Sequence, residues 1–277
     1  MIIFPNCKIN LGLNVLSRRK DGYYELQSIF YPLLFTDVLE VLQKNIKDEG
    51  SNNPELSVSG IAIETSSDNN LCIKAYQLLK NDFPDLPAVQ MHLHKNIPTG
   101  AGLGGGSADG AFTLKLLNQK FQLGLNNSQM LQYALQLGSN CPFFIINKPC
   151  FGTGRGEILE TVDLDLAAYQ IVLVHPGIHC STAHAFSQIQ PRMPVKSIKE
   201  IIRQPVVCWK NELQNDFEEL VFKEYPELRS IKEKLYECGA DYASLTGSGS
   251  TVYGLFKKTM EPRFHFPENY FVKILSG

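Results

Sequence analysis

Alternating apolar and polar positions predict that the first hundred residues are rich in strands. Five segments have the β-branched, aromatic or alternating pattern of strands: 7–16, 24–34, 37–42, 56–65 and 88–95. An Asp21-Gly22 pair separates the first two and is a turn signal. Residues 44–54 are polar and predict a loop, and Ser66–Asn69 predicts a turn.

Helical spacing appears between these strands and again in the second half of the chain. It predicts helices over 71–80, after Ser107 as N-cap, over 128–137, over 216–222 and over 227–238. The remaining apolar runs predict a buried strand at 141–146, a strand at 168–176, a strand–turn–strand at 242–256 and a short strand at 271–275. Mixed strands and helices predict an α/β or α+β protein. The glycine-rich segment 151–158 predicts a boundary between domains 1–150 and 151–277.

Composition and charge narrow the class of protein. The 44% hydrophobic and 19% charged residues are typical of a globular protein. Lys and Arg (26) nearly balance Asp and Glu (28), so we expect neither nucleic acid nor a membrane surface as a partner. No apolar run reaches the length of a membrane span, and we expect no signal peptide and a cytoplasmic location. The seven cysteines form no C-x-x-C pair, which indicates free thiols.

A cluster of glycines between a strand and a helix is the strongest chemical signal. Gly100, Gly102, Gly104, Gly105 and Gly106 lie within seven residues. Glycines let backbone N–H groups converge on an anion, and the helix that follows adds its positive dipole end, so the loop predicts a phosphate site. A dinucleotide fold is disfavoured because residues 110–156 contain no Asp or Glu for the ribose, and no Walker lysine or protein-kinase motif is present.

These residues together resemble the GHMP small-molecule kinases, whose phosphate loop reads P-x-x-x-G-L-G-x-S-S/A. Here the loop is Pro98-Thr-Gly-Ala-Gly-Leu-Gly-Gly-Gly-Ser-Ala108. Further matches are Lys8-Ile-Asn10 with Asp21-Gly-Tyr-Tyr-Glu-Leu-Gln27, Cys141-Pro-Phe-Phe144, Asn215-Asp216, Gly154-x-Gly-Glu157 and Leu245-Thr-Gly-Ser-Gly-Ser250. The similarity extends from residue 5 to about residue 256, so it covers nearly the whole chain.

The resemblance implies a two-domain α+β fold and a kinase activity. The N-terminal domain would be similar to the ribosomal S5 domain-2 fold and the C-terminal one to a ferredoxin-like α/β sandwich, with the active site in the cleft between them. The triple glycine and the 21–27 segment favour the branch that uses ATP and Mg²⁺ to phosphorylate the 2-hydroxyl of a cytidine-diphosphate-linked methylerythritol, in the non-mevalonate route to isoprenoid precursors. A monomer or a weak homodimer is compatible with the sequence.

The resemblance also assigns roles to single residues. Lys8 matches the catalytic lysine, which would stabilise both anionic oxygens of the transfer, although a lysine on an edge strand could simply reach solvent. The residues that match ATP-binding positions are Pro98, Thr99, Gly100, Ala101, Gly102, Leu103, Gly104, Gly105, Gly106, Ser107, Ala108, Asn70 and Lys95. Ser107 is also the candidate for contact with the metal, and Asn70 could equally be a helix N-cap.

Substrate contacts are implied at five positions. They are Asn10, Tyr23, Tyr24, Thr182 and Phe186. Tyr23 and Phe186 match the aromatic side chains that enclose the cytosine, although each could instead belong to the core. The turn Thr246, Gly247, Ser248 would add donors around the phosphates, or it could be only a hairpin turn.

Two departures from the family pattern bear on function. Tyr24 stands where the family has histidine, which puts the cytosine pocket in doubt. Asn140 stands where the family has its catalytic aspartate, and an amide cannot accept a proton near neutral pH. The sequence therefore leaves three readings: the kinase just described, a nucleotide-binding pseudokinase or impaired variant, and a GHMP kinase that acts on another small alcohol.

Overall fold

The computed structural model describes residues 1–44, 53–62 and 69–277 and divides them into two compact units. Unit 1 comprises residues 1–7, 35–99 and 104–147, and unit 2 comprises residues 8–34, 100–103 and 148–277.

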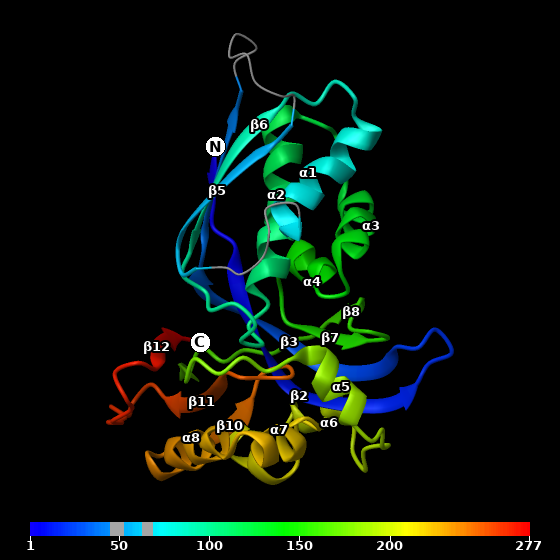
Figure 1. Ribbon diagram of the computed structural model, residues 1–277. Coiled ribbons are helices and arrows are strands. Elements are labelled where there is room, and N and C mark those ends of the chain that lie inside the picture. The colour runs from blue at the N-terminus through cyan, green and yellow to red at the C-terminus, as the bar shows by residue number, and fades with distance from the viewer. Residues whose placement is uncertain (45–52, 63–68) are drawn as a thin grey trace. The chain divides into compact units, whose positions relative to one another are not determined.

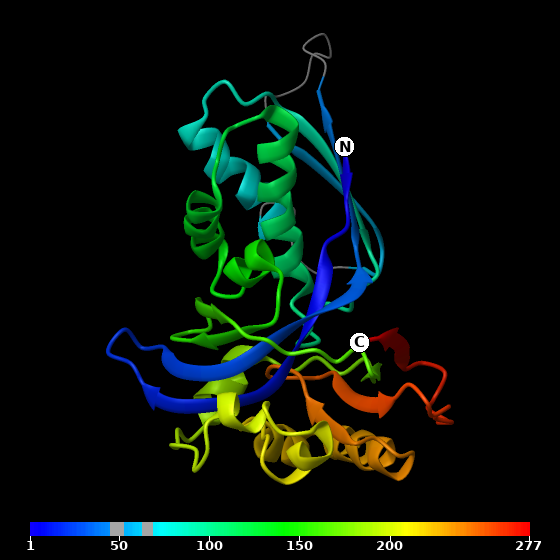
Figure 2. The same cartoon turned by 180° about the vertical axis from the view of Figure 1, so that it is seen from behind.

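Unit 1 is a four-stranded sheet with helices on one face (Figure 1). The strand order is β1 (Ile2–Ile3), β4 (Val38–Gln43), β6 (Val89–Lys95) and β5 (Glu55–Gly60), with β5 parallel to β6 and the other pairs antiparallel. The helices are α1 (Leu71–Asp82), α2 (Gly105–Phe121), α3 (Asn127–Leu137) and α4 (Cys141–Ile146). The reverse view in Figure 2 shows the same layering. Strand β6 alternates buried and exposed side chains, as a sheet with one covered face requires.

Unit 2 contains two further four-stranded sheets. The first has the order β2 (Asn6–Arg18), β3 (Tyr24–Thr36), β7 (Cys150–Thr153) and β8 (Ile158–Thr161), and the second has the order β10 (Tyr242–Leu245), β11 (Val252–Lys257), β9 (Tyr169–His175) and β12 (Phe271–Ser276). The helical segments are α5 (Thr182–Gln188), α6 (Ile198–Ile201), the 3₁₀ helix η2 (Val206–Asn211), α7 (Glu218–Glu224) and α8 (Pro226–Glu237). Helix α8 packs on β10 and β11.

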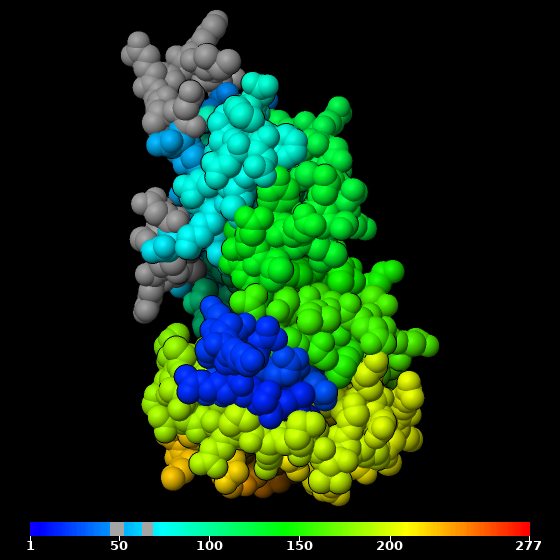
Figure 3. All heavy atoms as spheres, turned by 90° about the vertical axis from the view of Figure 1, so that its right-hand side faces the viewer, coloured from blue at the N-terminus to red at the C-terminus, as the bar shows by residue number. Residues whose placement is uncertain are grey.

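The long ribbon formed by β2 and β3 explains why the units are discontinuous in sequence. Strand β3 pairs with β7 from Ser28 to Phe30, which ties residues 8–34 to the chain after residue 148. The tip of the ribbon, from Lys20 to Tyr23, is exposed, and Figure 3 shows it in blue on the surface. The sequence-based division at residue 150 does not separate this ribbon from the first half of the chain.

Most predicted elements are present, with three corrections. Residues 141–146 form helix α4, not a strand, because a six-residue apolar run fits a buried helix as well as a buried strand. Helix α2 begins at Gly105 with Gly104 as N-cap, so Ser107 lies inside its first turn. The helix expected over 216–222 is α7, which begins at Glu218. Three predicted segments lie partly outside the described residues. They are most of the loop at 44–54, the end of the strand 56–65 and most of the turn at 66–69.

The seven cysteines, all of which lie among the described residues, form no disulfide bonds, as their spacing in the sequence predicts. All seven cysteines are free thiols, and five of them are buried. In the part of the chain that the structure describes, the helices lack the length and apolar character needed to cross a bilayer.

Candidate active site

The start of helix α2 in unit 1 presents free backbone donors. Gly104 has a φ of 74°, which is the left-handed region, and it caps the helix without any side-chain hydrogen bond. Gly104 has no side chain to cap the N–H groups of the first turn, which can therefore receive an anion, aided by the dipole of a 17-residue helix. A β-carbon on Gly106 would meet no atom of the described residues within 4 Å, so they leave the space beside this turn open.

Lys8 and Asn10 lie side by side on strand β2 in unit 2, as their spacing of two residues predicts. The Lys8 ammonium donates to Asn10 Oδ1 and to the Gly102 carbonyl, both at 2.5 Å. Lys8 is 5% exposed and Asn10 is 2% exposed, so the ammonium is held at the glycine loop and does not reach freely into solvent. Asn10 Nδ2 in turn donates to Ser28 at 2.7 Å, which fixes the amide.

The turn that begins at Thr246 also contacts the loop. The Thr246 hydroxyl accepts from Asn10 N–H at 3.0 Å and donates to the Gly102 carbonyl at 3.1 Å. The structure thus brings Lys8, Asn10, Gly102 and Thr246 together within unit 2, although they lie up to 238 residues apart in a 277-residue chain. The turn does more than connect two strands, because the Thr246 hydroxyl is hydrogen-bonded to the glycine loop.

Asn215 is not among the site residues predicted from the sequence, but its side chain holds the turn that begins at Thr246. Its Nδ2 donates to the carbonyl groups of Leu245 and Gly247, both at 2.8 Å. The neighbouring Asp216 accepts from Val15 N–H at 2.8 Å and so fixes the segment beside strand β2. The Asn215-Asp216 match to the family was the only signal that could have found this role.

Gly102 provides a test of how closely the loop and the turn must pack. Its φ is +75°, and a β-carbon would lie 2.1 Å from the Thr246 carbonyl oxygen. We expect Gly102→Ala to lower the free energy of unfolding by about 3 kcal/mol or more, because a backbone clash adds to the left-handed strain of about 1–2 kcal/mol. Gly177→Ala is the matched control, since Gly177 has a φ of +82° with nothing within 4 Å. Urea unfolding of both variants measures the difference, and equal losses would contradict the clash.

The aromatic residues expected around the cytosine make contacts with several neighbours. Tyr24, not Tyr23, faces Phe186, with ring centroids 5.4 Å apart and planes at 25°. Phe186 also meets Phe217 edge-on at 4.9 Å. Tyr23 is 56% exposed and lies under the Arg155 guanidinium, 4.8 Å from its ring centroid. Tyr24 and Phe186 are therefore the two rings that stack on each other.

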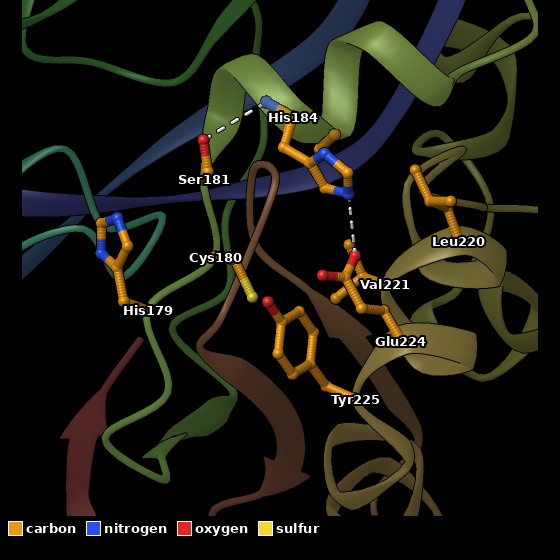
Figure 4. A pocket seen from close by; sticks show the side chains of 9 residues that line it. His179, Cys180, Ser181, His184, Leu220, Val221, Glu224 and Tyr225 are labelled. Atoms are coloured by element: carbon orange, nitrogen blue, oxygen red, sulfur yellow. Dashed lines mark hydrogen bonds and ion pairs between the residues drawn. The ribbon is translucent and has the colours of Figure 1, made fainter.

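Helix α5 carries both Phe186 and Thr182, and a cavity of about 200 Å³ lies between it and α7 (Figure 4). Thr182 shares a 2.9 Å hydrogen bond with Ser248 of the turn. His184 Nε2 lies 3.3 Å from the Glu224 carboxylate across the cavity, and Ser181 caps the helix. These contacts fix the helix at both ends of its first turn.

Asn140 lies at the start of helix α4 in unit 1. It is the N-cap residue, it is exposed, and its side chain makes no capping hydrogen bond. The next residue, Cys141, is buried, and burial raises the pKa of its thiol to about 11 although Ser107 hydrogen-bonds to it. Ser107 and Asn140 thus both lie near the N-terminal ends of their helices, α2 and α4, which pack together.

Lys95 and Asn70, expected near the adenine, have clear structural roles in unit 1. Asn70 caps α1 by accepting from Cys72 N–H at 2.9 Å, as the N-cap alternative requires. The Lys95 ammonium is 2% exposed and pairs with Asp37 and, at 2.8 Å, with Asp109. Burial by itself lowers the pKa of Lys95, but the two carboxylates outweigh it and raise the pKa. Burial raises the pKa of Asp109 to about 7 against the attraction of Lys95.

Comparison with known proteins places this arrangement in a family. Residues 70–148 match the GHMP kinases N terminal domain and residues 197–264 the GHMP kinases C terminal domain. The chain is 52% identical over 256 residues to the 4-diphosphocytidyl-2-C-methyl-D-erythritol kinase of Bacteroides fragilis, covering 92% of each chain. The chain belongs to the 4-diphosphocytidyl-2-C-methyl-D-erythritol kinase family. The kinase of this name from Azobacteroides pseudotrichonymphae is 48% identical, over 98% of this chain and 100% of its own.

Solved structures agree with membership of the 4-diphosphocytidyl-2-C-methyl-D-erythritol kinase family. A crystal structure of 4-(cytidine 5'-diphospho)-2C-methyl-D-erythritol kinase matches all of both chains with a TM-score of 0.79 at 26% identity. The mevalonate kinase of Methanococcus jannaschii has a TM-score of 0.68 at 14% identity, covering 94% of this chain and 91% of its own, which shows a shared fold alone. The α+β fold of GHMP kinases expected from the sequence is confirmed.

Proposed function

We propose that the protein transfers the γ-phosphate of ATP to the 2-hydroxyl of 4-(cytidine 5'-diphospho)-2-C-methyl-D-erythritol, giving the 2-phosphate and ADP. The observation that carries the proposal is the 48–52% identity, over more than 90% of the chain, to kinases named for this substrate. The glycine loop, Lys8 and Asn10 support it, because they provide phosphate donors and a cation of the kind that phosphoryl transfer needs. The same assignment places the reaction in isoprenoid precursor synthesis.

The nucleotide would bind through the phosphate loop, from Pro98 to Ala108. The free N–H groups at the start of α2 would bind its phosphates, and the open space beside Gly106 suits a large anion. Among the described residues, no three His, Cys, Asp or Glu side chains are grouped so as to hold a metal ion. We propose the Ser107 hydroxyl, in the first turn of α2, as the contact for Mg²⁺ that arrives with ATP, since this ion keeps waters and phosphate oxygens around it.

The Lys8 ammonium is the group that would act on the transferred phosphoryl group. The ammonium donates to two neutral oxygens, Asn10 Oδ1 and the Gly102 carbonyl, which hold it at the glycine loop. A fixed cation at the loop would stabilise the charge that spreads over the phosphate oxygens and the attacking hydroxyl in the transition state. Asn10 and Thr246 would hold this geometry before the substrate binds.

Cytosine recognition is proposed for the Tyr24 and Phe186 pair. We expect Tyr24→Leu to weaken binding of CDP about tenfold, because stacking of a base on an aromatic ring contributes about 1–3 kcal/mol. Tyr23→Leu is the matched comparison, since Tyr23 is the aromatic residue that the family pattern favours. Isothermal titration of CDP into both variants decides between them. If only Tyr23→Leu weakens CDP binding, then Tyr23, as the family pattern predicts, contacts the cytosine and Tyr24 does not.

The proposed activity is tested by ADP release with ATP, Mg²⁺ and the cytidylyl methylerythritol substrate. We expect release above the ATP-only background, and a new phosphomonoester signal on the 2-hydroxyl in the phosphorus NMR spectrum of the product. Mevalonate and homoserine serve as acceptor controls. Release with either of them but not with the cytidylyl substrate would contradict the proposal. Cytoplasmic location and a monomeric or weakly dimeric state stay predictions.

A further inference from the structure

A buried ion cluster in unit 1 joins the two ends of the phosphate loop. It consists of Asp37, Lys95 and Asp109, which are 0%, 2% and 3% exposed. Lys95 is the last residue of β6, which leads into the loop, and Asp109 lies in the second turn of α2, which leaves it. Asp37 comes from the connection between β3 and β4. The three side chains thus meet from three separate segments.

Asp37 holds the strand end directly. Its Oδ1 accepts from the N–H groups of Asn96 at 2.6 Å and Ile97 at 2.9 Å, and its Oδ2 pairs with the Lys95 ammonium. Three consecutive residues before Pro98 are therefore fixed by one carboxylate. Lys95 carries the connection onward to Asp109 Oδ2 at 2.8 Å.

The start of α2 rests against the same cluster. A β-carbon on Gly105 would lie 3.3 Å from Lys95 Nζ and 3.0 Å from Ile97 Cγ2. These distances are tight for a β-carbon, so the backbone of the first helical residue packs closely against Lys95 and Ile97. The N–H donors of the first turn therefore belong to a backbone that packs against the cluster.

Stability alone is a poor explanation for such a cluster. One ammonium is shared by two carboxylates, and Asp109 Oδ1 is buried without a hydrogen-bond partner among the described residues. Removing charges from water costs several kcal/mol per ion, and an apolar cluster of similar volume is often as stable or more so. What an apolar cluster would not provide is the directional bonds to Asn96, Ile97 and Lys95 that set the two ends of the loop.

We propose that Asp37 is a positioning residue for nucleotide binding, acting through Lys95 and the backbone of residues 96–97 on the donors of the phosphate loop. The proposal rests on the proposed function, because it needs a nucleotide in that loop. Asp37 does not touch the nucleotide in this proposal. Its effect is on the geometry of the donors, so it should change nucleotide affinity and leave the cytidine ligand, which would contact unit 2 residues, unaffected.

The test measures two affinities in the same variants of the full chain. Titrations of ADP with Mg²⁺ and of CDP are carried out on the wild type, Asp37→Asn, Asp109→Asn and Leu79→Ala. Asp37→Asn keeps the size and one acceptor oxygen but loses the charge, and we expect the Kd for ADP to rise about tenfold or more while the Kd for CDP stays within about twofold. Asp109→Asn should raise the Kd for ADP by a smaller factor, and it serves as the second variant if Asp37→Asn does not fold.

Leu79→Ala separates positioning from general stability. Leu79 is fully buried in α1, so its truncation should lower the melting temperature while leaving both affinities unchanged. Two outcomes would overturn this inference and leave the proposed function standing. One is an unchanged ADP affinity in the folded Asp37 or Asp109 variant, and the other is a parallel loss of ADP and CDP affinity. Failure of the wild type to bind ADP would overturn the nucleotide site of the proposed function together with it.

Discussion

Replacing Lys8 by methionine is expected to lower kcat about a thousandfold while the protein stays folded and still binds ADP. Lys8 is the buried cation at the glycine loop, bonded to Asn10 Oδ1 and the Gly102 carbonyl at 2.5 Å each. Removal of one preorganised electrostatic donor costs about 10²–10³ in kcat, and a full positive charge belongs at the upper end of that range. Methionine preserves most of the side-chain volume, so the main loss is the charge. Steady-state ADP release measures kcat, and titration with ADP measures the remaining affinity.

Lys80→Met is the matched control for this experiment. Like Lys8, Lys80 donates to two neutral oxygens, in this case the backbone carbonyls of Pro84 and Leu86 at the C-terminal end of α1. Its removal should change stability slightly and kcat by less than about twofold, because the lysine has no part in the proposed site. A Lys8→Met enzyme whose kcat stays within threefold of the wild type would refute the proposed role of Lys8.

Asn140→Asp is expected to raise kcat about 10²–10⁴-fold if the reaction needs a general base. Asn140 stands at the N-cap of α4, where it is exposed and makes no capping bond, so a carboxylate can take its place without loss of a capping bond. Aspartate is also a favourable N-cap residue, so the substitution should not destabilise the helix. ADP release by the two forms, measured side by side with the cytidylyl substrate, gives the ratio.

Asn126→Asp controls for the added negative charge. Asn126 is the N-cap of α3, where its side chain accepts from Gln129 N–H at 3.0 Å, so the same change is made at another helix start in unit 1. We expect kcat to stay unchanged in this variant. Equal turnover of the wild type and Asn140→Asp would show that positioning and electrostatics carry the transfer without a carboxylate at this position. No turnover in either would contradict the substrate assignment.

Local pattern was sufficient for the phosphate loop and for most of the helices. The alternation of residues 88–95 and the helical spacing after the glycines are properties of short segments, so the strand, the loop and α2 follow from the sequence. The pattern failed at residues 141–146, because Cys141 to Ile146 are apolar throughout and carry no period that distinguishes a helix from a strand. It also placed the N-cap at Ser107, since side-chain preference does not foresee that Gly104 enters the left-handed region.

The family resemblance supplied the candidate residues but not their contacts. It singled out Lys8, Asn10 and Thr246, and the structure shows that Lys8 and Thr246 donate to the Gly102 carbonyl while Asn10 bonds to both of them. It paired Tyr23 with Phe186, whereas the ring that stacks on Phe186 is that of Tyr24. Tyr23 precedes β3 and Tyr24 is its first residue, and which of the two side chains faces helix α5 depends on the register and twist of the ribbon, which the local pattern does not determine.

The sequence by itself determined the α+β class and the glycine loop between a strand and a helix, because these depend on side-chain period and glycine content. Only the tertiary structure decided that residues 8–34 pack with the second half of the chain, that Asn215 holds the Thr246 turn, and that Asp37 and Asp109 share Lys95. Each of these contacts joins segments far apart in sequence. Their geometry arises from sheet pairing and core packing, which fix side chains in space only when the whole unit has folded.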